Sequence, residues 1–287
     1  MDIRELTITG PDAGPYSLTT GPDGTLWVTC AHSGELVRIS PGGDVTTIGL
    51  DAPQSQPAVI VAGPDDAVWF TRTRDDTISR LGTDLRSFPL PTGSGAYGLA
   101  AGPDGALWFT AMTTSRIGRL APDGTVTEFP LPDAAFPAMI TAGPDGALWF
   151  TLNQANAIGR ITTGGDVRLH ELPTPDAAPV GITSDGVDLW FVEIGAGQLG
   201  RITTGGTITE FPLSDRTARP HAIAAAGVGD LWFTEWGANR IGHRTPDGTL
   251  TAHDLPTEKS EPHGITVDAT GGVWAALEIG RLTHIVS

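Results

Sequence analysis

Residues Gly102 to Thr110 read Gly-Pro-Asp-Gly-Ala-Leu-Trp-Phe-Thr, a tight turn followed by a short β-strand with one large aromatic side chain. The same letters recur at 143–151, and looser copies run along the whole chain. The tryptophan marks the phase of each copy, and neighbouring copies are 39 to 42 residues apart: Trp27, Trp69, Trp108, Trp149, Trp190, Trp232 and Trp274. A fixed period of this length is typical of an array of equivalent supersecondary units.

One complete unit shows what is repeated. Turns rich in glycine and proline separate four short segments with strand character, at 138–141, 147–151, 157–161 and 167–172. A parallel arrangement would need a crossover helix, and no helical periodicity is present, so the strands are expected to pair antiparallel. The chain is therefore predicted to be an all-β, seven-bladed β-propeller of four-stranded antiparallel blades, with residues 1–287 forming a single domain. The periodic tryptophans are expected to fill the interfaces between blades.

The two ends of the chain are predicted to close the ring. The last unit stops at its third strand, in residues 281–285, whereas residues 3–8 match the fourth strand of other units, such as 126–131. We expect the N-terminal segment to supply the missing outer strand of the last blade, because this pairing removes two free sheet edges.

Composition narrows the classes of partner. The formal net charge of −16 argues against a nucleic-acid partner, which would need basic patches. No apolar run of about 18 residues is present, and the first residues lack the basic and apolar regions of a secretory signal. The single cysteine, Cys30, rules out an internal disulfide and fits a reducing compartment. We expect a monomeric, cytoplasmic protein without a membrane partner.

Function is expected where the repeat is broken. The residue that opens the innermost strand differs from unit to unit: Tyr16, Ala58, Tyr97, Ala138, Val180, His221 and His263. Because the innermost strands line the central channel of a propeller, these residues should ring one of its mouths. The two histidines then lie side by side on blades six and seven, and Tyr16 flanks His263 from blade one.

Carboxylates are expected at the same mouth. Three residues after tryptophan, where the second strand ends, units five and six carry Glu193 and Glu235, and unit seven carries Glu278 one place later. Glu261 and His263 are two residues apart in a segment expected to be extended, which would point both side chains the same way. Glu261, His263 and Glu278 should therefore converge at blade seven.

Such a cluster has two interpretations. It is either a metal site with a general acid or base or a salt-bridged surface cluster, and its place at a channel mouth favours the metal site. Two carboxylates and water suit Mg²⁺, whereas His263 as a third ligand would also admit Zn²⁺ or Mn²⁺. The remaining histidines are expected away from the mouth, in solvated or structural roles: His32, His170, His243, His253 and His284.

At this level of detail the chain resembles the virginiamycin B lyase family, whose members linearise cyclic streptogramin antibiotics. The resemblance covers the entire chain. Its most specific segments are Arg-Pro-His-Ala-Ile at 219–223, Leu-Trp-Phe-Thr-Glu-Trp-Gly-Ala-Asn at 231–239 and Lys-Ser-Glu-Pro-His-Gly-Ile at 259–265. One departure is Ala275, which stands where most units carry phenylalanine after tryptophan, and it is expected to loosen the packing behind Glu278.

The resemblance implies roles for particular residues. Glu261 and Glu278 would hold Mg²⁺, His263 would be the catalytic acid or base, and His221 would contact the substrate. Aromatic residues at the mouth would help to hold the macrocycle, namely Tyr16, Tyr97 and Trp236.

The reaction that the resemblance implies is an elimination. The substrate would be a small cyclic depsipeptide, a type B streptogramin, closed by an ester to a threonine side-chain oxygen. Loss of the threonine α-proton, with His263 expected as the proton acceptor, would break the C–O bond without water. Bound Mg²⁺ would stabilise the charge that develops on a substrate carbonyl oxygen. The protein would then be a carbon–oxygen lyase that confers antibiotic resistance. Two alternatives stay open, a lactone or ester hydrolase and a non-catalytic ligand-binding propeller on the same scaffold.

Overall fold

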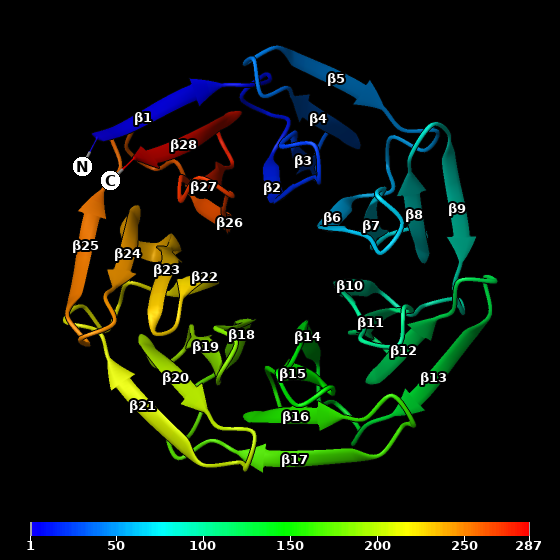
Figure 1. Cartoon of the computed structure of the whole chain (residues 1–287), viewed down its shortest axis with the longest axis vertical. Coiled ribbons are helices and arrows are strands. Elements are labelled where there is room, and N and C mark those ends of the chain that lie inside the picture. The colour runs from blue at the N-terminus through cyan, green and yellow to red at the C-terminus, as the bar shows by residue number, and fades with distance from the viewer. Residues whose placement is uncertain (1, 287) are drawn as a thin grey trace.

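Seven four-stranded antiparallel sheets surround a central channel in the computed structural model, which describes residues 2–286 (Figure 1). Blades one to six run outward from the channel in chain order, starting with β2. The last sheet has the order β1-β28-β27-β26. Within the described residues the only helix is the 3₁₀ turn η1 (Trp236–Ala238). The predicted seven-bladed, all-β propeller is thus confirmed.

Each blade runs from an innermost strand at the channel to an outermost strand at the rim. Blades one to three comprise β2 (Pro15–Thr20), β3 (Leu26–Cys30), β4 (Glu35–Ile39), β5 (Val45–Gly49), β6 (Pro57–Ala62), β7 (Val68–Arg72), β8 (Thr77–Leu81), β9 (Leu85–Pro89), β10 (Ala96–Ala101), β11 (Leu107–Ala111), β12 (Arg116–Leu120) and β13 (Val126–Pro130). Blades four and five comprise β14 (Pro137–Ala142), β15 (Leu148–Leu152), β16 (Ala157–Ile161), β17 (Val167–Glu171), β18 (Pro179–Ser184), β19 (Leu189–Glu193), β20 (Gln198–Ile202) and β21 (Ile208–Pro212). Blades six and seven comprise β22 (Pro220–Gly227), β23 (Asp230–Glu235), β24 (Arg240–Arg244), β25 (Leu250–Asp254), β26 (Pro262–Val267), β27 (Val273–Leu277), β28 (Arg281–Val286) and β1 (Asp2–Thr7).

The ring closes through the first strand. β1 pairs antiparallel with β28, from Asp2 opposite Val286 to Thr7 opposite Arg281. Figure 1 shows the first and last segments side by side at the outer edge of blade seven. The predicted closure is confirmed, and it leaves blade seven with the same four strands as its neighbours.

The residues that recur from unit to unit build the scaffold. The indole N–H of Trp108 donates to Asp104 of the preceding turn (3.0 Å), and the other oxygen of Asp104 accepts from Nε of Arg119 (2.7 Å). Trp108 is buried, stacks on Phe129 of the outermost strand and packs against residues of blade four. The tryptophan therefore fills the interface between blades, as expected, and the arginine of the third strand is bonded to the same turn aspartate.

The packing of the second strand against the third in blade seven differs from that in the other blades. In blade three, Phe109 lies over Gly118 of the next strand, where an added Cβ would come 2.0 Å from the ring. In blade seven the smaller Ala275 faces the larger Thr283, and both side chains are fully buried. The larger side chain on the facing strand thus fills part of the space left by the smaller one, and looser packing behind Glu278 stays a prediction.

A β-bulge follows the first residue of every innermost strand. In blade seven, Pro262 pairs with Leu277 and Ile265 pairs with Ala275, so one extra residue lies on the inner strand. In blade six, a threonine of the second strand holds the bulge and also contacts the next blade. Thr234 Oγ1 accepts from the backbone N–H of Ala222 (2.9 Å) and donates to the His263 carbonyl of the next blade (2.9 Å). The bulge therefore fixes the residues that ring the channel mouth.

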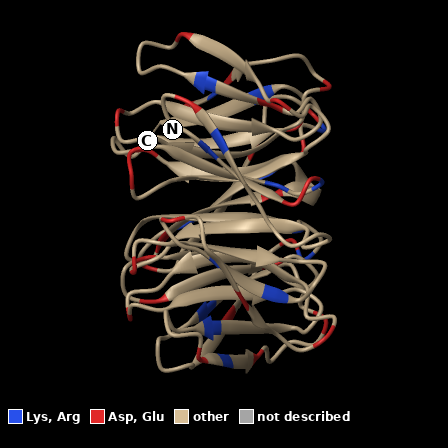
Figure 2. Ribbon diagram, turned by 90° about the vertical axis from the view of Figure 1, so that its right-hand side faces the viewer, with Lys and Arg blue, Asp and Glu red and all other residues tan. Residues whose placement is uncertain are grey.

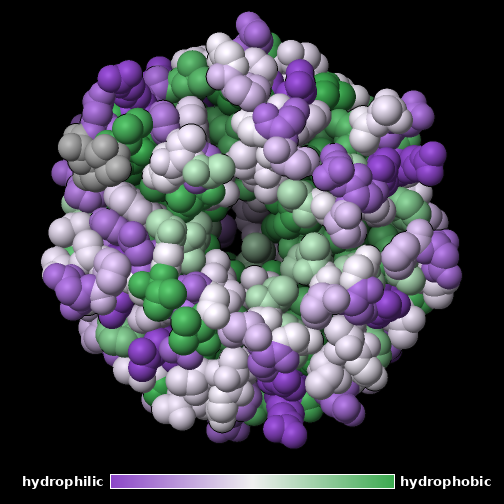
Figure 3. Space-filling view, viewed as in Figure 1, coloured by the Kyte–Doolittle hydropathy of each residue, from purple (hydrophilic) through white to green (hydrophobic). Residues whose placement is uncertain are grey.

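The channel encloses a cavity of about 350 Å³. Its lining is mainly aliphatic, with Tyr16, Tyr97 and His221 as the large polar side chains. The space-filling view shows the ring hollowed at its centre, over the inner strands (Figure 3). Seen edge-on, many of the acidic residues lie in the loops at the two faces of the ring (Figure 2). Within residues 2–286 the structure holds no helix with the length and hydropathy to span a membrane.

Candidate metal and acid–base site

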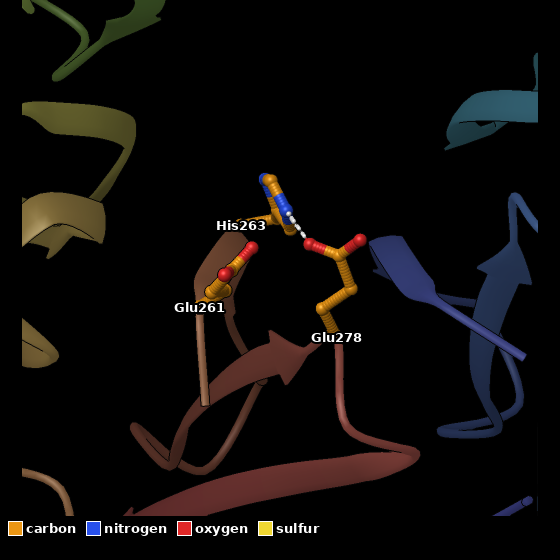
Figure 4. A group of neighbouring side chains, drawn as sticks. All are labelled: Glu261, His263 and Glu278. Carbon is orange, nitrogen blue, oxygen red and sulfur yellow. Dashed lines mark hydrogen bonds and ion pairs between the residues drawn. The ribbon is translucent and has the colours of Figure 1, made fainter. Parts of the chain in front are cut away.

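Glu261, His263 and Glu278 converge at blade seven (Figure 4). Glu261 immediately precedes β26, His263 is the second residue of β26, and Glu278 follows β27. One potential ligand atom from each residue lies within 4.8 Å of the others. His263 Nε2 lies 2.8 Å from Glu278 Oε2 in a hydrogen bond. The structure thus brings together the three residues that the sequence placed in one cluster.

The convergence does not come from an extended backbone, and this part of the prediction is wrong. Glu261 has a φ of 49°, in the left-handed region, and the strand begins only at Pro262. His263 then lies in the bulge, which changes the direction of side chains on the inner strand. A turn followed by a bulge, rather than strand alternation, directs both side chains to Glu278.

The charge balance of the cluster fits a divalent cation. The pKa of Glu261 is raised, first by a hydrogen bond with Glu278 that requires a shared proton, then by burial and by repulsion from the same carboxylate. A cation between two carboxylates would take the place of that proton and remove the repulsion. Two carboxylates with a nearby imidazole are a donor set that accommodates Mg²⁺, Mn²⁺ or Zn²⁺.

His263 is held neutral at the mouth of the channel. Burial lowers its pKa to about 4; Glu261 acts in the opposite direction, and His32 lowers the pKa further. The ring packs beside Tyr16, with centroids 4.7 Å apart, and beside His221, with centroids 5.1 Å apart. Nε2 faces Glu278, whereas Nδ1 is buried and has no hydrogen-bond partner among the described residues.

His221, Tyr16 and Tyr97 line the channel cavity next to His263. Burial lowers the pKa of His221 to about 3, and the neighbouring His263 adds to this shift. The hydroxyl groups of Tyr16 and Tyr97 are hydrogen-bonded to each other, and burial raises the pKa of both phenols. At neutral pH this part of the mouth therefore offers uncharged hydrogen-bonding groups on an aromatic surface.

Trp236 lies apart from these three residues. It belongs to η1, is half-buried and has Arg219 over its ring at 5.7 Å. It lines a separate depression of about 580 Å³ that it shares with Glu261. Three of the four residues expected to hold a substrate thus border the channel cavity, and Trp236 borders the carboxylate cluster from blade six.

Two other carboxylates do not reach the mouth. Glu193 is fully buried and accepts from Nε2 of Gln198 (2.6 Å) within blade five. Glu235 is also buried and pairs with Arg240 (2.7 Å) within blade six. The expectation that these carboxylates would share the mouth is wrong, because the last residue of the second strand faces the third strand of its own blade.

His32 belongs to the cluster, although the repeat pattern placed it elsewhere. Its Nε2 lies 3.2 Å from Glu278 Oε1. The signal in the sequence was its position five residues after Trp27 in blade one, which becomes the neighbour of blade seven once the ring is closed. The other histidines remain outside the cluster. Three of them stack on tryptophans of their own blades, as expected for structural residues: His170, His243 and His284.

The fold and the site define a class of protein: a seven-bladed propeller with a potential metal and acid–base centre at one mouth of its channel. Within this class, the sequence model of the virginiamycin B lyase family matches residues 1–285. The chain therefore belongs to the virginiamycin B lyase family.

Individual relatives agree with this assignment. A solved streptogramin B lyase is 42% identical, with a TM-score of 0.96, and the match covers 99% of this chain and 96% of that chain. A catalytically inactive histidine-to-alanine variant of virginiamycin B lyase from Staphylococcus aureus, solved with quinupristin, is 40% identical, with a TM-score of 0.94 and coverage of 99% and 98%. The match to virginiamycin B lyase of Saccharopolyspora erythraea is 56% identical over 52 residues, and it spans 18% of this chain and 17% of that relative.

Proposed function

We propose that this protein is a Mg²⁺-dependent carbon–oxygen lyase that linearises type B streptogramins by elimination at the threonine ester. The observation that carries the proposal is the position of His263, hydrogen-bonded to one of two neighbouring carboxylates beside Tyr16 at the channel mouth. Opening the ring of such an antibiotic would confer resistance on the cell that contains the enzyme.

In this proposal Glu261 and Glu278 hold the cation. The two carboxylates repel each other unless a positive charge lies near them, and this repulsion supports the assignment. When bound, Mg²⁺ supplies Lewis-acid stabilisation of negative charge on a carbonyl oxygen of the substrate. With a cation held there by Glu261 and Glu278, the α-proton of the threonine residue would be acidic enough for an imidazole base to remove.

His263 is the proposed proton acceptor. The carboxylate of Glu278 accepts a hydrogen bond from Nε2 of His263, and this contact favours the tautomer with the proton on Nε2. The lone pair then lies on Nδ1, the buried atom without a partner in the described structure. Burial keeps the ring uncharged at neutral pH, so Nδ1 carries a lone pair that can accept the threonine α-proton once binding of the macrocycle exposes this nitrogen.

The channel mouth offers the surface that would hold the macrocycle. Tyr16, Tyr97 and His221 provide rings and hydrogen-bonding groups around the cavity, and Trp236 provides an indole on the other side of Glu261. The bound quinupristin in the Staphylococcus aureus relative supports a cyclic depsipeptide as substrate, and the inactivity of its histidine-to-alanine variant supports a catalytic imidazole.

Mass spectrometry of a type B streptogramin incubated with the protein tests the proposal. Elimination gives a linear product with the mass of the substrate, whereas hydrolysis adds one water. We expect the unchanged mass, with a dehydrated residue at the former ester, and no product after treatment with EDTA. A product heavier by one water would replace the lyase with a hydrolase. The monomeric state and cytoplasmic location stay predictions, which size-exclusion chromatography and cell fractionation check.

A further inference from the structure

His32 occupies the seam at which blade one meets blade seven. It follows β3, and its backbone N–H donates to the carbonyl of Ala13 (3.1 Å). The imidazole lies against Gly14, where an added Cβ would come 2.6 Å from Nδ1. Gly14 has a φ of 64° and immediately precedes β2. Because it has no side chain, it leaves room for the His32 ring.

From this position the imidazole reaches a carboxylate of the other blade. Nε2 of His32 lies 3.2 Å from Oε1 of Glu278, and Nε2 of His263 lies 2.8 Å from Oε2 of the same carboxylate. Each oxygen of Glu278 thus lies next to an imidazole, one from each side of the seam: His263 through a hydrogen bond and His32 at ion-pair distance. His32, Glu261 and Glu278 also line one depression of about 260 Å³, open to solvent at the rim.

We propose that His32 is a positioning residue of the cation centre. It holds the Glu278 carboxylate from blade one, so that the centre spans the seam of the ring. The inference rests on the proposed function for the use of the cation in catalysis. A ligating carboxylate that is fixed by a partner loses less conformational freedom on binding a metal ion, and loss of such partners typically weakens metal affinity about 10- to 100-fold.

A purely structural role for His32 would have a different consequence. Its side chain is more than half exposed, with 53% of its surface accessible, so its removal takes little apolar area out of the core. Truncation should leave the melting temperature of the metal-free protein unchanged and should change only the affinity for the cation. The two quantities therefore separate positioning from stability.

The experiment titrates the purified full chain with Mg²⁺ by calorimetry. The variants are His32→Ala, His32→Gln, whose amide nitrogen lies close to the place of Nε2, and the matched control His253→Ala in an outermost strand. We expect the dissociation constant of His32→Ala to rise about tenfold, that of His32→Gln to stay within about threefold of wild type, and that of His253→Ala to be unchanged. Thermal melts without metal accompany each titration.

Three results would overturn the inference: no binding of Mg²⁺ by the wild type, equal affinity in wild type and His32→Ala, or a loss of affinity that glutamine does not restore. The last result would make the imidazole itself a ligand. The antibiotic assay separates this inference from the proposed function. If Mg²⁺ affinity depends on His32 but streptogramin stays intact, the positioning role stands and the lyase fails. If the antibiotic ring is opened while His32→Ala binds Mg²⁺ like the wild type, the lyase function stands and the positioning role of His32 fails.

Discussion

Glu5, in the first strand, and Arg281, in the last, are joined by an ion pair of 2.9 Å across 276 positions of the chain. The carboxylate of Glu5 also accepts a hydrogen bond from the backbone N–H of Thr257 in blade six (3.0 Å). Because these contacts favour the ionised form, the pKa of Glu5 is lowered although burial opposes the shift. The first strand thus links blade seven to blade six.

Deletion of residues 1–8 should therefore destabilise the whole ring. The truncated chain loses the β1–β28 ladder and the contacts of Glu5, and it exposes β28 as a free edge. We expect a melting temperature well below that of the wild type by circular dichroism. Asp2→Ala serves as the control, since the side chain of Asp2 forms an ion pair with the exposed Arg4 of the same strand. A truncated protein that melts like the wild type would show that closure contributes nothing to stability.

The fold was predictable from sequence because the scaffold residues repeat. In blades two, three and four the tryptophan, its turn aspartate and the arginine of the third strand make the same contacts, so one unit describes the next. The site was only partly predictable. His263 and Glu261 stand out where the repeat is broken, but the left-handed turn at Glu261 and the bulge at His263 depend on backbone conformation that residue types do not specify.

The sequence placed His32 away from the site for a different physical reason. Its contact with Glu278 joins residues from opposite ends of the chain and exists only once the ring is closed. A sequence repeat relates equivalent positions in different units. It does not predict a contact between the loop of one unit and the loop of the next. Glu193 and Glu235 have another cause, because each is bonded to a side chain on the adjacent strand of its own blade and the repeat does not specify that partner.

The seam also contains a packing defect that a substitution should fill. In blade three Phe129 stacks on Trp108 at the outermost strand, whereas Leu6 occupies the corresponding place in blade seven. An apolar groove of about 350 Å³ remains, lined by Leu6, Leu26 and Trp274 among others. Leu6→Phe should raise the free energy of unfolding by about 0.5–1 kcal/mol through additional apolar burial.

Urea denaturation measures the effect of Leu6→Phe. Leu6→Ala provides the opposite change and should lower the free energy of unfolding. A Leu6→Phe protein that unfolds at a lower urea concentration than wild type would show that the groove does not accommodate a ring, and that the larger side chain strains the seam.

His263→Ala should abolish ring opening while the propeller stays folded. The side chain is the proposed base, and loss of a general base typically slows a reaction by about 10²- to 10⁴-fold. The ring lies at the channel mouth rather than in a core cluster, so the melting temperature should change little. Turnover is followed by chromatography of the antibiotic. His253→Ala is the matched control, and a His263→Ala protein with wild-type turnover would exclude His263 as the base.

Glu261→Gln should weaken Mg²⁺ binding without loss of stability. Glu261 is exposed, and the repulsion between its carboxylate and that of Glu278 disappears when one becomes an amide. We expect equal or higher thermal stability in EDTA, together with a much higher dissociation constant for Mg²⁺ by calorimetry. Undiminished affinity for Mg²⁺ would mean that Glu261 does not hold the cation.

Glu193 should make the stability of the fold depend on pH. Burial raises the pKa of its carboxyl to about 7, against a value of 4.5 in an unfolded chain. Because the folded protein holds this proton more tightly, the stabilisation is complete below about pH 4.5 and is lost as the pH rises to about 7. The shift corresponds to about 3 kcal/mol at the alkaline end of this range.

Glu193→Gln isolates this contribution, since an amide oxygen still accepts the hydrogen bond from Gln198 and carries no charge. We expect the variant and the wild type to have similar free energies of unfolding near pH 5, and the variant to be more stable near pH 8, because only the wild type must bury a carboxylate there. Urea denaturation at a series of pH values gives the two curves. Parallel curves across that interval would mean that Glu193 is ionised in the folded protein and finds compensating contacts within blade five.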